Sequence, residues 1–284
     1  MDPRERLYEP ATAADAMLCA GGGKTLYLGT LDYVDWHLHS VPAFVAGLRG
    51  DFRLRYAGED WLTCRAAVIP AGVCHALDAG GEPLAVFYPE PNVANLSNLA
   101  RLGVGWDQCG HILLARHPGP DIFRELYENP SSLEFSGEAL DHLVNFMQAI
   151  DGPPALDPRL ARVLRWLNTR PADPTPAGQL ADALGLSVSR FLHLFSQQIG
   201  VPFRRFRIWI RLRAASQMAL SGRSLTEAAH SAGFSDSAHF ARLHRDTFGV
   251  TPSYTFRKLA RVGRIAPFGA SDKFGPSSVS PEAR

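Results

Sequence analysis

Three histidines are the residues of this chain whose types and spacing could support metal chemistry. His37 and His39 are separated by one residue, so on a β-strand both imidazoles would lie on the same side. His75 ends a Pro-x-Gly-x-x-His stretch that begins at Pro70. Three imidazoles suit zinc, iron, copper or nickel, so the three residues could hold a divalent metal. The alternative is that this turn only shapes its strand and that its histidine is hydrogen-bonded.

Arginines are the second group, and they gather in one half of the chain. Residues 157–260 hold 15 Lys and Arg, 14 of them Arg, against 6 Asp and Glu. Residues 1–156 hold 10 Lys and Arg against 20 Asp and Glu, although the whole chain carries a net charge of only +1. The guanidinium group is well shaped to bind phosphate. This division predicts that the C-terminal half binds nucleic acid and that the acidic half does not, because a merely solvated charged face would not produce it.

The elements that must position these arginines form a repeated pattern. In residues 225–252, apolar residues at helical spacing precede Gly233, and a second amphipathic helix carries Phe240 and Leu243. Residues 180–202 repeat the pattern 48 or 49 positions earlier. We therefore predict two helix-turn-helix units joined by a helix over residues 203–220. That helix would be about 27 Å long, which suits two recognition helices spaced about one DNA turn apart.

The outward faces of the predicted recognition helices supply candidate DNA contacts. Arg and His can donate to guanine, whereas Ala and Leu suit a thymine methyl group. Arg204, Arg205, Arg207 and Arg213, in the joining helix, are predicted to contact phosphate instead. Besides Arg213, the predicted DNA-binding residues are Ser189, Arg190, Leu192, His193, Arg204, Arg205, Arg207, Ser237, Ala238, Ala241, Arg242 and Arg245.

The N-terminal half reads as strands followed by helices. Residues 24–90 are short apolar or alternating runs broken by Gly, Pro and Asp, which predicts a small β-barrel or sandwich. Residues 92–150 have helical periodicity, and these helices could form a dimer contact or pack against the barrel. Gly152-Pro153-Pro154 cannot continue a helix and marks a boundary. We therefore expect a domain over 1–150, a linker over 151–156, a DNA-binding domain over 157–261 and a disordered tail over 262–284.

Four cysteines, Cys19, Cys64, Cys74 and Cys109, are widely separated and show no Cys-x-x-Cys spacing. This favours reduced thiols over a disulfide framework or a zinc finger. The first residues have no apolar core of the kind found in a signal peptide, and no apolar run approaches about 18 residues. We expect a cytoplasmic protein with no membrane partner.

The repeated pattern resembles the AraC/XylS family of bacterial transcription regulators over about a hundred residues. Its motifs here are Ala181-x3-Gly185, Phe191-x2-Leu194-Phe195, Gly200-x-Pro202-Phe203, Arg211-Leu212-x2-Ala215, Ala229-x3-Gly233-Phe234 and Phe248-Gly249-Val250-x-Pro252. His244 departs from the family, which usually has Phe there. The two histidine motifs resemble those of the cupin superfamily, a barrel fold that many AraC-type regulators use to sense effectors.

The resemblance implies an α+β two-domain protein with a cupin-like β-barrel, following helices and a C-terminal all-α domain. Its implied function is sequence-specific binding of double-stranded DNA in response to a small-molecule effector, with RNA polymerase and a second copy of the chain as further partners. A metal-sensing regulator that uses the cupin histidines is one alternative. A cupin enzyme with an accessory DNA-binding domain is another, but Ala43, Phe44 and Val45 occupy the place of the glutamate that metal-binding cupins supply. We therefore expect that the protein is not an enzyme.

Overall fold

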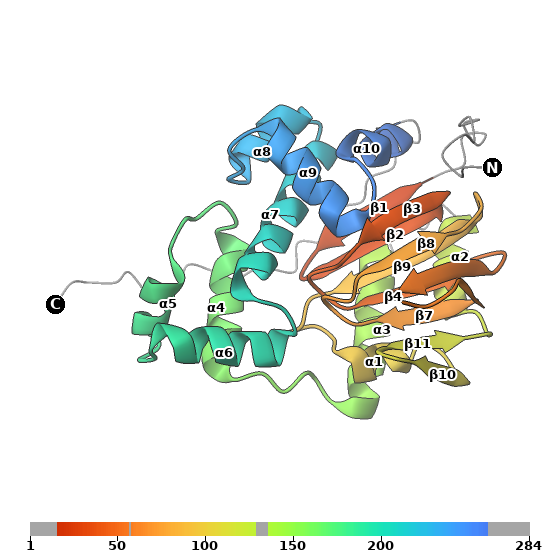
Figure 1. Cartoon of the computed structure of the whole chain (residues 1–284), viewed down its shortest axis with the longest axis horizontal. Coiled ribbons are helices and arrows are strands. Elements are labelled where there is room, and N and C mark those ends of the chain that lie inside the picture. Colours follow the sequence, from red (N-terminus) through yellow and green to blue (C-terminus); the bar gives the residue numbers. More distant parts are fainter. Residues whose placement is uncertain (1–15, 57, 129–135, 261–284) are drawn as a thin grey trace.

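The structure is a computed structural model that describes residues 16–56, 58–128 and 136–260 of the chain. Within these ranges a strand-rich N-terminal part is followed by a helical C-terminal part, whose helices gather on one side of the sheets (Figure 1). The predicted two-part α+β organisation is therefore confirmed. The predicted disordered tail, residues 262–284, lies outside the described residues.

The strands form two antiparallel sheets. The seven-stranded sheet has the order β1-β2-β9-β4-β7-β11-β10, and the four-stranded sheet has the order β3-β8-β5-β6. The strands are β1 (Met17–Gly21), β2 (Lys24–Thr30), β3 (Tyr33–His37), β4 (Ala43–Gly47), β5 (Phe52–Tyr56), β6 (Leu62–Cys64), β7 (Ala66–Ile69), β8 (His75–Asp78), β9 (Pro83–Pro89), β10 (Trp106–Cys109) and β11 (Ile112–Ala115). In the described part of the chain no ladder joins the two sheets, so the predicted β-barrel is not closed.

The central strands of the seven-stranded sheet, β2, β9, β4 and β7, are buried on both faces, because successive side chains alternate between the faces and every residue of these strands is buried. Leu26, Leu28 and Phe87 face one way and share an apolar cluster with three helices, α1 (Leu96–Ala100), α2 (Asp121–Glu128) and α3 (Ser136–Asp151). These helices therefore pack against the sheet, which was one of the two predicted roles for residues 92–150.

One part of that segment differs from the prediction of helices alone. β10 and β11 form a hairpin between α1 and α2, and β11 pairs with β7. Gly110 closes the hairpin with φ of +58°, a conformation that favours glycine. Each strand has four residues, which is too short for alternation to stand out in the sequence.

The helical part is built from two helix pairs on either side of one long helix. Its elements are α4 (Pro158–Thr169), α5 (Ala177–Ala183), α6 (Val188–Ile199), α7 (Phe203–Leu220), α8 (Leu225–Ser231), α9 (Ser237–Phe248) and α10 (Pro252–Ala260). Gly185 and Gly233 form the turns of the α5–α6 and α8–α9 pairs, with φ of +65° and +85°. α7 contacts both pairs. The Asp157 side chain accepts from the Arg159 amide and caps α4.

The two parts share one apolar core. The Tyr88 ring of β9 lies 5.5 Å from the Trp209 ring of α7 and 6.0 Å from the Phe248 ring of α9. Contacts of this kind place α7 and α9 directly on the inner face of the sheet. Among the described helices, none has the length and apolarity needed to cross a membrane.

Candidate nucleic-acid interface and interdomain cavity

α6 presents the predicted recognition residues of the first helix pair to solvent. The Ser187 hydroxyl caps the helix by accepting from the Arg190 amide at 3.2 Å. Phe191, Phe195 and Ile199 are buried on the opposite face. The exposed residues at the start of the helix include all four that were predicted: Ser189, Arg190, Leu192 and His193.

α9 has the same construction in the second pair. The Asp236 carboxylate caps it by accepting from the His239 amide at 2.6 Å. Phe240 is buried and Ala241 is half-buried. The other predicted contacts are exposed: Ser237, Ala238, Arg242 and Arg245. Each helix pair therefore offers a polar, partly basic surface at the beginning of its second helix.

The predicted phosphate-binding arginines of α7 do not share one environment. Arg204 is exposed and Arg205 is half-buried. Arg207 donates to the Thr175 carbonyl at 2.8 Å and also to the Asp173 carbonyl, so it supports the segment before α5. Arg213 is buried and ion-paired with Glu90, which makes the prediction that it contacts phosphate wrong for this arrangement. The position of Arg213 in the helical pattern does not show that the sheet covers the side of α7 from which this side chain projects.

Glu90 is the centre of the polar contact between the two parts. It follows the last residue of β9 and is fully buried. Its carboxylate accepts from Arg213, from Asn168 Nδ2 of α4 at 2.9 Å and from Trp209 Nε1 at 3.4 Å. Charge-assisted hydrogen bonds of this kind are stronger than neutral ones. Glu90 therefore joins α4 and α7 to the sheet.

The end of α9 is seated on β3. The Leu38 amide donates to the Asp246 carbonyl at 3.2 Å. Gly249 ends α9 with φ of +71°. A Cβ atom at this position would lie 2.4 Å from Val34 Cγ1 and 2.8 Å from the Asp35 carbonyl oxygen. Only glycine therefore allows this approach of the second helix pair to the strand that carries His37.

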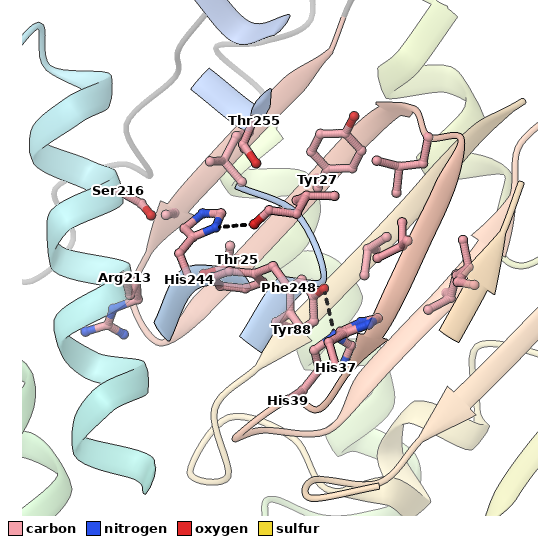
Figure 2. A pocket seen from close by; sticks show the side chains of 18 of the residues that line it. Thr25, Tyr27, His37, His39, Tyr88, Arg213, Ser216, His244, Phe248 and Thr255 are labelled. Atoms are coloured by element: carbon pink, nitrogen blue, oxygen red, sulfur yellow. Dashed lines mark hydrogen bonds between the residues drawn. The ribbon is translucent and has the colours of Figure 1, made fainter. Parts of the chain in front are cut away.

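A cavity lies between the sheets and the helices α7, α9 and α10 (Figure 2). Its volume is about 90 Å³. Most of its wall is apolar or aromatic, and the sheets and the helices both contribute. Its lining residues include Thr25, Tyr88, Trp209, Arg213, Phe248 and His244, together with the three candidate metal ligands.

The structure brings His37, His39 and His75 together at one end of this cavity. One nitrogen from each ring lies within 4.8 Å of the others, and the Nε2 atoms of His37 and His39 are 3.1 Å apart. Nδ1 of His37 donates to the Asp35 carbonyl at 2.7 Å, and Nδ1 of His75 donates to the Val73 carbonyl at 3.0 Å. A carbonyl only accepts, so these Nδ1 atoms carry the proton. Nε2 of His37 then accepts from Nε2 of His39, which also lies 3.2 Å from the Tyr88 hydroxyl oxygen, so a bound metal would replace these hydrogen bonds.

Burial keeps these imidazoles neutral near pH 7. Desolvation lowers the pKa of His37 to about 3 and that of His75 to about 4. Desolvation also lowers the pKa of His39, and the nearby His75 and His37 lower it further. A neutral imidazole is the form that coordinates a metal.

His244 is a cavity residue whose role the sequence did not indicate. It is buried, and its Nδ1 donates to the Val250 carbonyl at 2.8 Å. Its ring lies 4.8 Å from the Phe248 ring and 5.8 Å from the Phe240 ring. Desolvation lowers its pKa to about 4. The only feature of the sequence that drew attention to His244 was that the AraC/XylS family usually has Phe at this position.

A strand-rich part followed by two helix pairs on a long helix defines a two-part α+β protein with a helix-turn-helix region. The model of a family described as "Helix-turn-helix domain" matches residues 180–258. The transcriptional activator RhaS of Escherichia fergusonii is 32% identical over 104 residues, which cover 36% of this chain and 37% of RhaS. The transcriptional activator NphR of Rhodococcus sp is 35% identical over 106 residues, which cover 37% of this chain and 31% of NphR.

The chain thus spans about a third of the length of these curated relatives. A solved structure of ToxT from Vibrio cholerae strain SCE256, with an unsaturated fatty acid bound, is similar with a TM-score of 0.57. It is 13% identical, and the similarity covers 86% of this chain and 99% of that one. At this identity it establishes the fold alone.

Residues 180–258 therefore belong to this helix-turn-helix family, and the resemblance of the chain to the AraC/XylS regulators is confirmed. Both curated relatives are named as transcriptional activators. This agrees with the prediction that the protein is a regulator and not a cupin enzyme.

Proposed function

We propose that this chain is a transcription regulator that binds double-stranded DNA sequence-specifically and responds to a small molecule held between its two parts. A cupin-like effector domain over residues 1–150 is joined by the linker 151–156 to a DNA-binding domain over 157–261. The observation that carries the proposal is the pair of exposed faces on α6 and α9, both within the segment that matches the helix-turn-helix family.

In this proposal the recognition helices α6 and α9 read bases, and the start of α7 binds phosphate. Arg190 and His193 of α6 and Arg242 of α9 are exposed and can make directional bonds to base edges. Arg204 is also exposed, and Arg205 is half-buried; both lie at the start of α7, where a DNA backbone would pass between the two recognition helices. Arg207 donates from Nη1 and Nη2 to two backbone carbonyls, so in this proposal it holds the segment before α5 instead of a phosphate.

Binding of the full chain to cognate and scrambled duplexes at several salt concentrations tests this division. We expect Arg242→Ala to cost about 1–3 kcal/mol at the cognate site and to relax preference at one base pair. Arg205→Ala should weaken binding to both duplexes alike and make the salt slope shallower by about one. Equal losses on both duplexes for Arg242→Ala would show that this arginine holds phosphate. If the parent chain shows no salt-dependent binding to any promoter fragment from its own genome, the DNA-binding proposal itself fails.

The effector site of this proposal is the cavity between the sheets and α7, α9 and α10. An engineered cavity that admits benzene has a volume of roughly 150 Å³. A ligand of the size of benzene or larger must therefore widen the present cavity, whose volume is about 90 Å³. Because Tyr88 of the sheet and Trp209 and Phe248 of the helices face the same space, widening it shifts the helices against the sheet. The ToxT structure with a bound unsaturated fatty acid supports an apolar effector. Homodimer formation and contact with RNA polymerase stay predictions from the family resemblance.

The histidine cluster favours a second candidate, a metal-sensing regulator. Ligand nitrogens around a tetrahedral Zn²⁺ at its usual bond lengths lie about 3.4 Å apart, close to the 3.1 Å between His37 Nε2 and His39 Nε2. The backbone carbonyls of Asp35 and Val73 fix the tautomers of His37 and His75 in the way that second-layer partners orient metal ligands. The residues present therefore fit a divalent metal such as Zn²⁺, which would act here as a structural or sensing ion.

Elemental analysis of the purified full chain tests the metal site. We expect about one Zn²⁺ per chain after reconstitution, lost in His39→Ala and kept in His142→Ala, whose exposed imidazole lies on α3. A second readout is the visible absorption of Co²⁺, which is intense for tetrahedral nitrogen sites. Equal metal content in both variants would show that the cluster is only a hydrogen-bonded group of core histidines.

A further inference from the structure

The first recognition helix, α6, carries an exposed apolar pair. In the described helical part of the chain, residues 158–260, Val188 and Leu192 are the large apolar side chains that are exposed, at 44% and 37%. A Cβ atom at Gly178 of α5 would lie 3.8 Å from Val188 Cγ2, so a side chain there would cover Val188, and glycine leaves it open. The other large apolar side chains of this part pack against its cores, so this pair lacks the cover that they have.

The pair belongs to the face of α6 that would meet DNA. Val188 and Leu192 lie on the same side of the helix, because residues four apart in an α-helix are separated by about one turn. Ser189, Arg190 and His193, at the same end of α6, are also exposed. The first residues of the second helix in a helix-turn-helix are those that contact base edges. The pair therefore lies where bases would meet it.

The chemistry of the pair restricts which bases suit it. Val188 and Leu192 have no side-chain donor or acceptor, so they cannot recognise the polar groups of a base edge. The apolar group that a base presents in the major groove is the C5 methyl of thymine. The two side chains start about 6 Å apart along the helix, and two steps of the duplex span about 7 Å. One turn of α6 can thus contact the methyl groups of two nearby thymines.

The second recognition helix, α9, does not repeat this pair. Both helices begin at equivalent residues, α6 at Val188 and α9 at Ser237, 49 positions later. At the same offset Leu192 corresponds to Ala241, which is half-buried and has only one methyl group. The hydroxyl of Ser237 makes its exposed position polar. The two recognition helices therefore present different surfaces, and the two halves of the DNA site need not have the same sequence.

We infer that Val188 and Leu192 make the half of the DNA site read by α6 selective for thymine, through contact with its C5 methyl groups. This inference rests on the proposed DNA binding and names the base that the first helix selects. Arg190 and His193, next to the pair, supply directional bonds to neighbouring base edges. The apolar pair adds selectivity for a group that hydrogen bonds cannot recognise.

Replacement of thymine by deoxyuridine tests the inference, because it removes the C5 methyl group and keeps the base-pairing edge. The full chain is titrated with a promoter fragment from its own genome in which each thymine in turn is replaced. We expect about 2–4-fold weaker binding when one of one or two thymines in one half of the site is replaced. Unchanged binding to every substituted duplex overturns the inference and leaves the DNA-binding proposal standing. Absence of binding to any promoter fragment refutes both.

Alanine variants assign the effect to the pair. In the double variant Val188→Ala with Leu192→Ala, deoxyuridine at these thymines should no longer weaken binding, because the side chains that contact the methyl groups are gone. Both positions are exposed and alanine is a good helix former, so we expect the double variant to fold. Discrimination between thymine and uracil that persists in the double variant overturns the inference.

Two controls separate methyl contact from a general loss of binding. Arg190→Ala should weaken binding to the thymine and uracil duplexes alike and keep the ratio of their affinities. Val104→Ala, which removes a side chain of the N-terminal part that is 68% exposed, should change neither the affinity nor the ratio. A loss of the ratio in Arg190→Ala as complete as in the double variant would show that the effect comes from the seating of α6 as a whole, and it would overturn the assignment to Val188 and Leu192.

Discussion

Replacing His244 by Phe should make the protein less sensitive to acid. The folded pKa of this imidazole is about 4, because burial disfavours its charged form, against about 6.5 in an unfolded chain. The unfolded chain therefore binds more protons than the folded one between about pH 4 and pH 6.5. Across this window the free energy of unfolding contributed by His244 rises with pH, and it is lost on acidification.

The size of the effect follows from these two pKa values. Between about pH 8 and pH 5, linkage gives a loss of about 2 kcal/mol for this single group. Phe cannot take up a proton, and the rings of Phe240 and Phe248 already surround this position. The variant loses the bond to the Val250 carbonyl, so its stability near pH 8 should lie within about 1 kcal/mol of the parent.

Urea unfolding of the parent and of His244→Phe at both pH values measures this difference. We expect the variant to lose about 2 kcal/mol less than the parent on acidification, because the other buried histidines are present in both. Thr247→Val, a buried substitution on the same helix with no titratable group, should keep the parent's pH dependence. Parallel curves for the parent and His244→Phe would refute the claim that this imidazole is neutral when folded.

Other substitutions separate structural arginines from those that contact DNA. Glu90→Ala should lower the free energy of unfolding, measured in urea, by about 3–5 kcal/mol, because it leaves the Arg213 charge buried without a partner. As a control, Arg124→Ala, which breaks an exposed ion pair with Asp121, should lower it by less than about 1 kcal/mol. Arg207→Ala should reduce stability through lost bonds to the segment before α5, measured in the same unfolding experiment. Full stability with a shallower salt slope of DNA binding would instead make Arg207 a phosphate contact.

The helical half was largely predictable because its signals are local. Gly185, Gly233 and the caps Ser187 and Asp236 lie within a few residues of the turns and helix ends that they fix. The apolar spacing around Phe191 and Phe240 then determines which side chains of each helix remain exposed. Local periodicity is sufficient for such elements, and the predicted surfaces of α6 and α9 followed from it.

The cavity could not be predicted in this way because its walls come from distant parts of the sequence. Tyr88 meets Trp209 and Phe248 only after the two parts have packed together. Arg213 reads as one more exposed arginine of a basic helix until Glu90, 123 positions away, is placed beside it. The three histidines were recognised from short spacings, but the carbonyls that fix their tautomers depend on backbone geometry.

The unbroken course of α7 has a mechanical consequence. One side of this 18-residue helix forms a cavity wall, and its two ends lead into the two helix pairs. As a stiff rod of about 27 Å, it would move each end by about 2.4 Å when tilted by about 10° around its midpoint. The rise per base pair of DNA is about 3.4 Å. A tilt of this size, set by the molecule in the cavity, would therefore move the two recognition helices by a distance comparable to one base pair. Such a movement would align them with two fixed binding positions on the DNA, or misalign them.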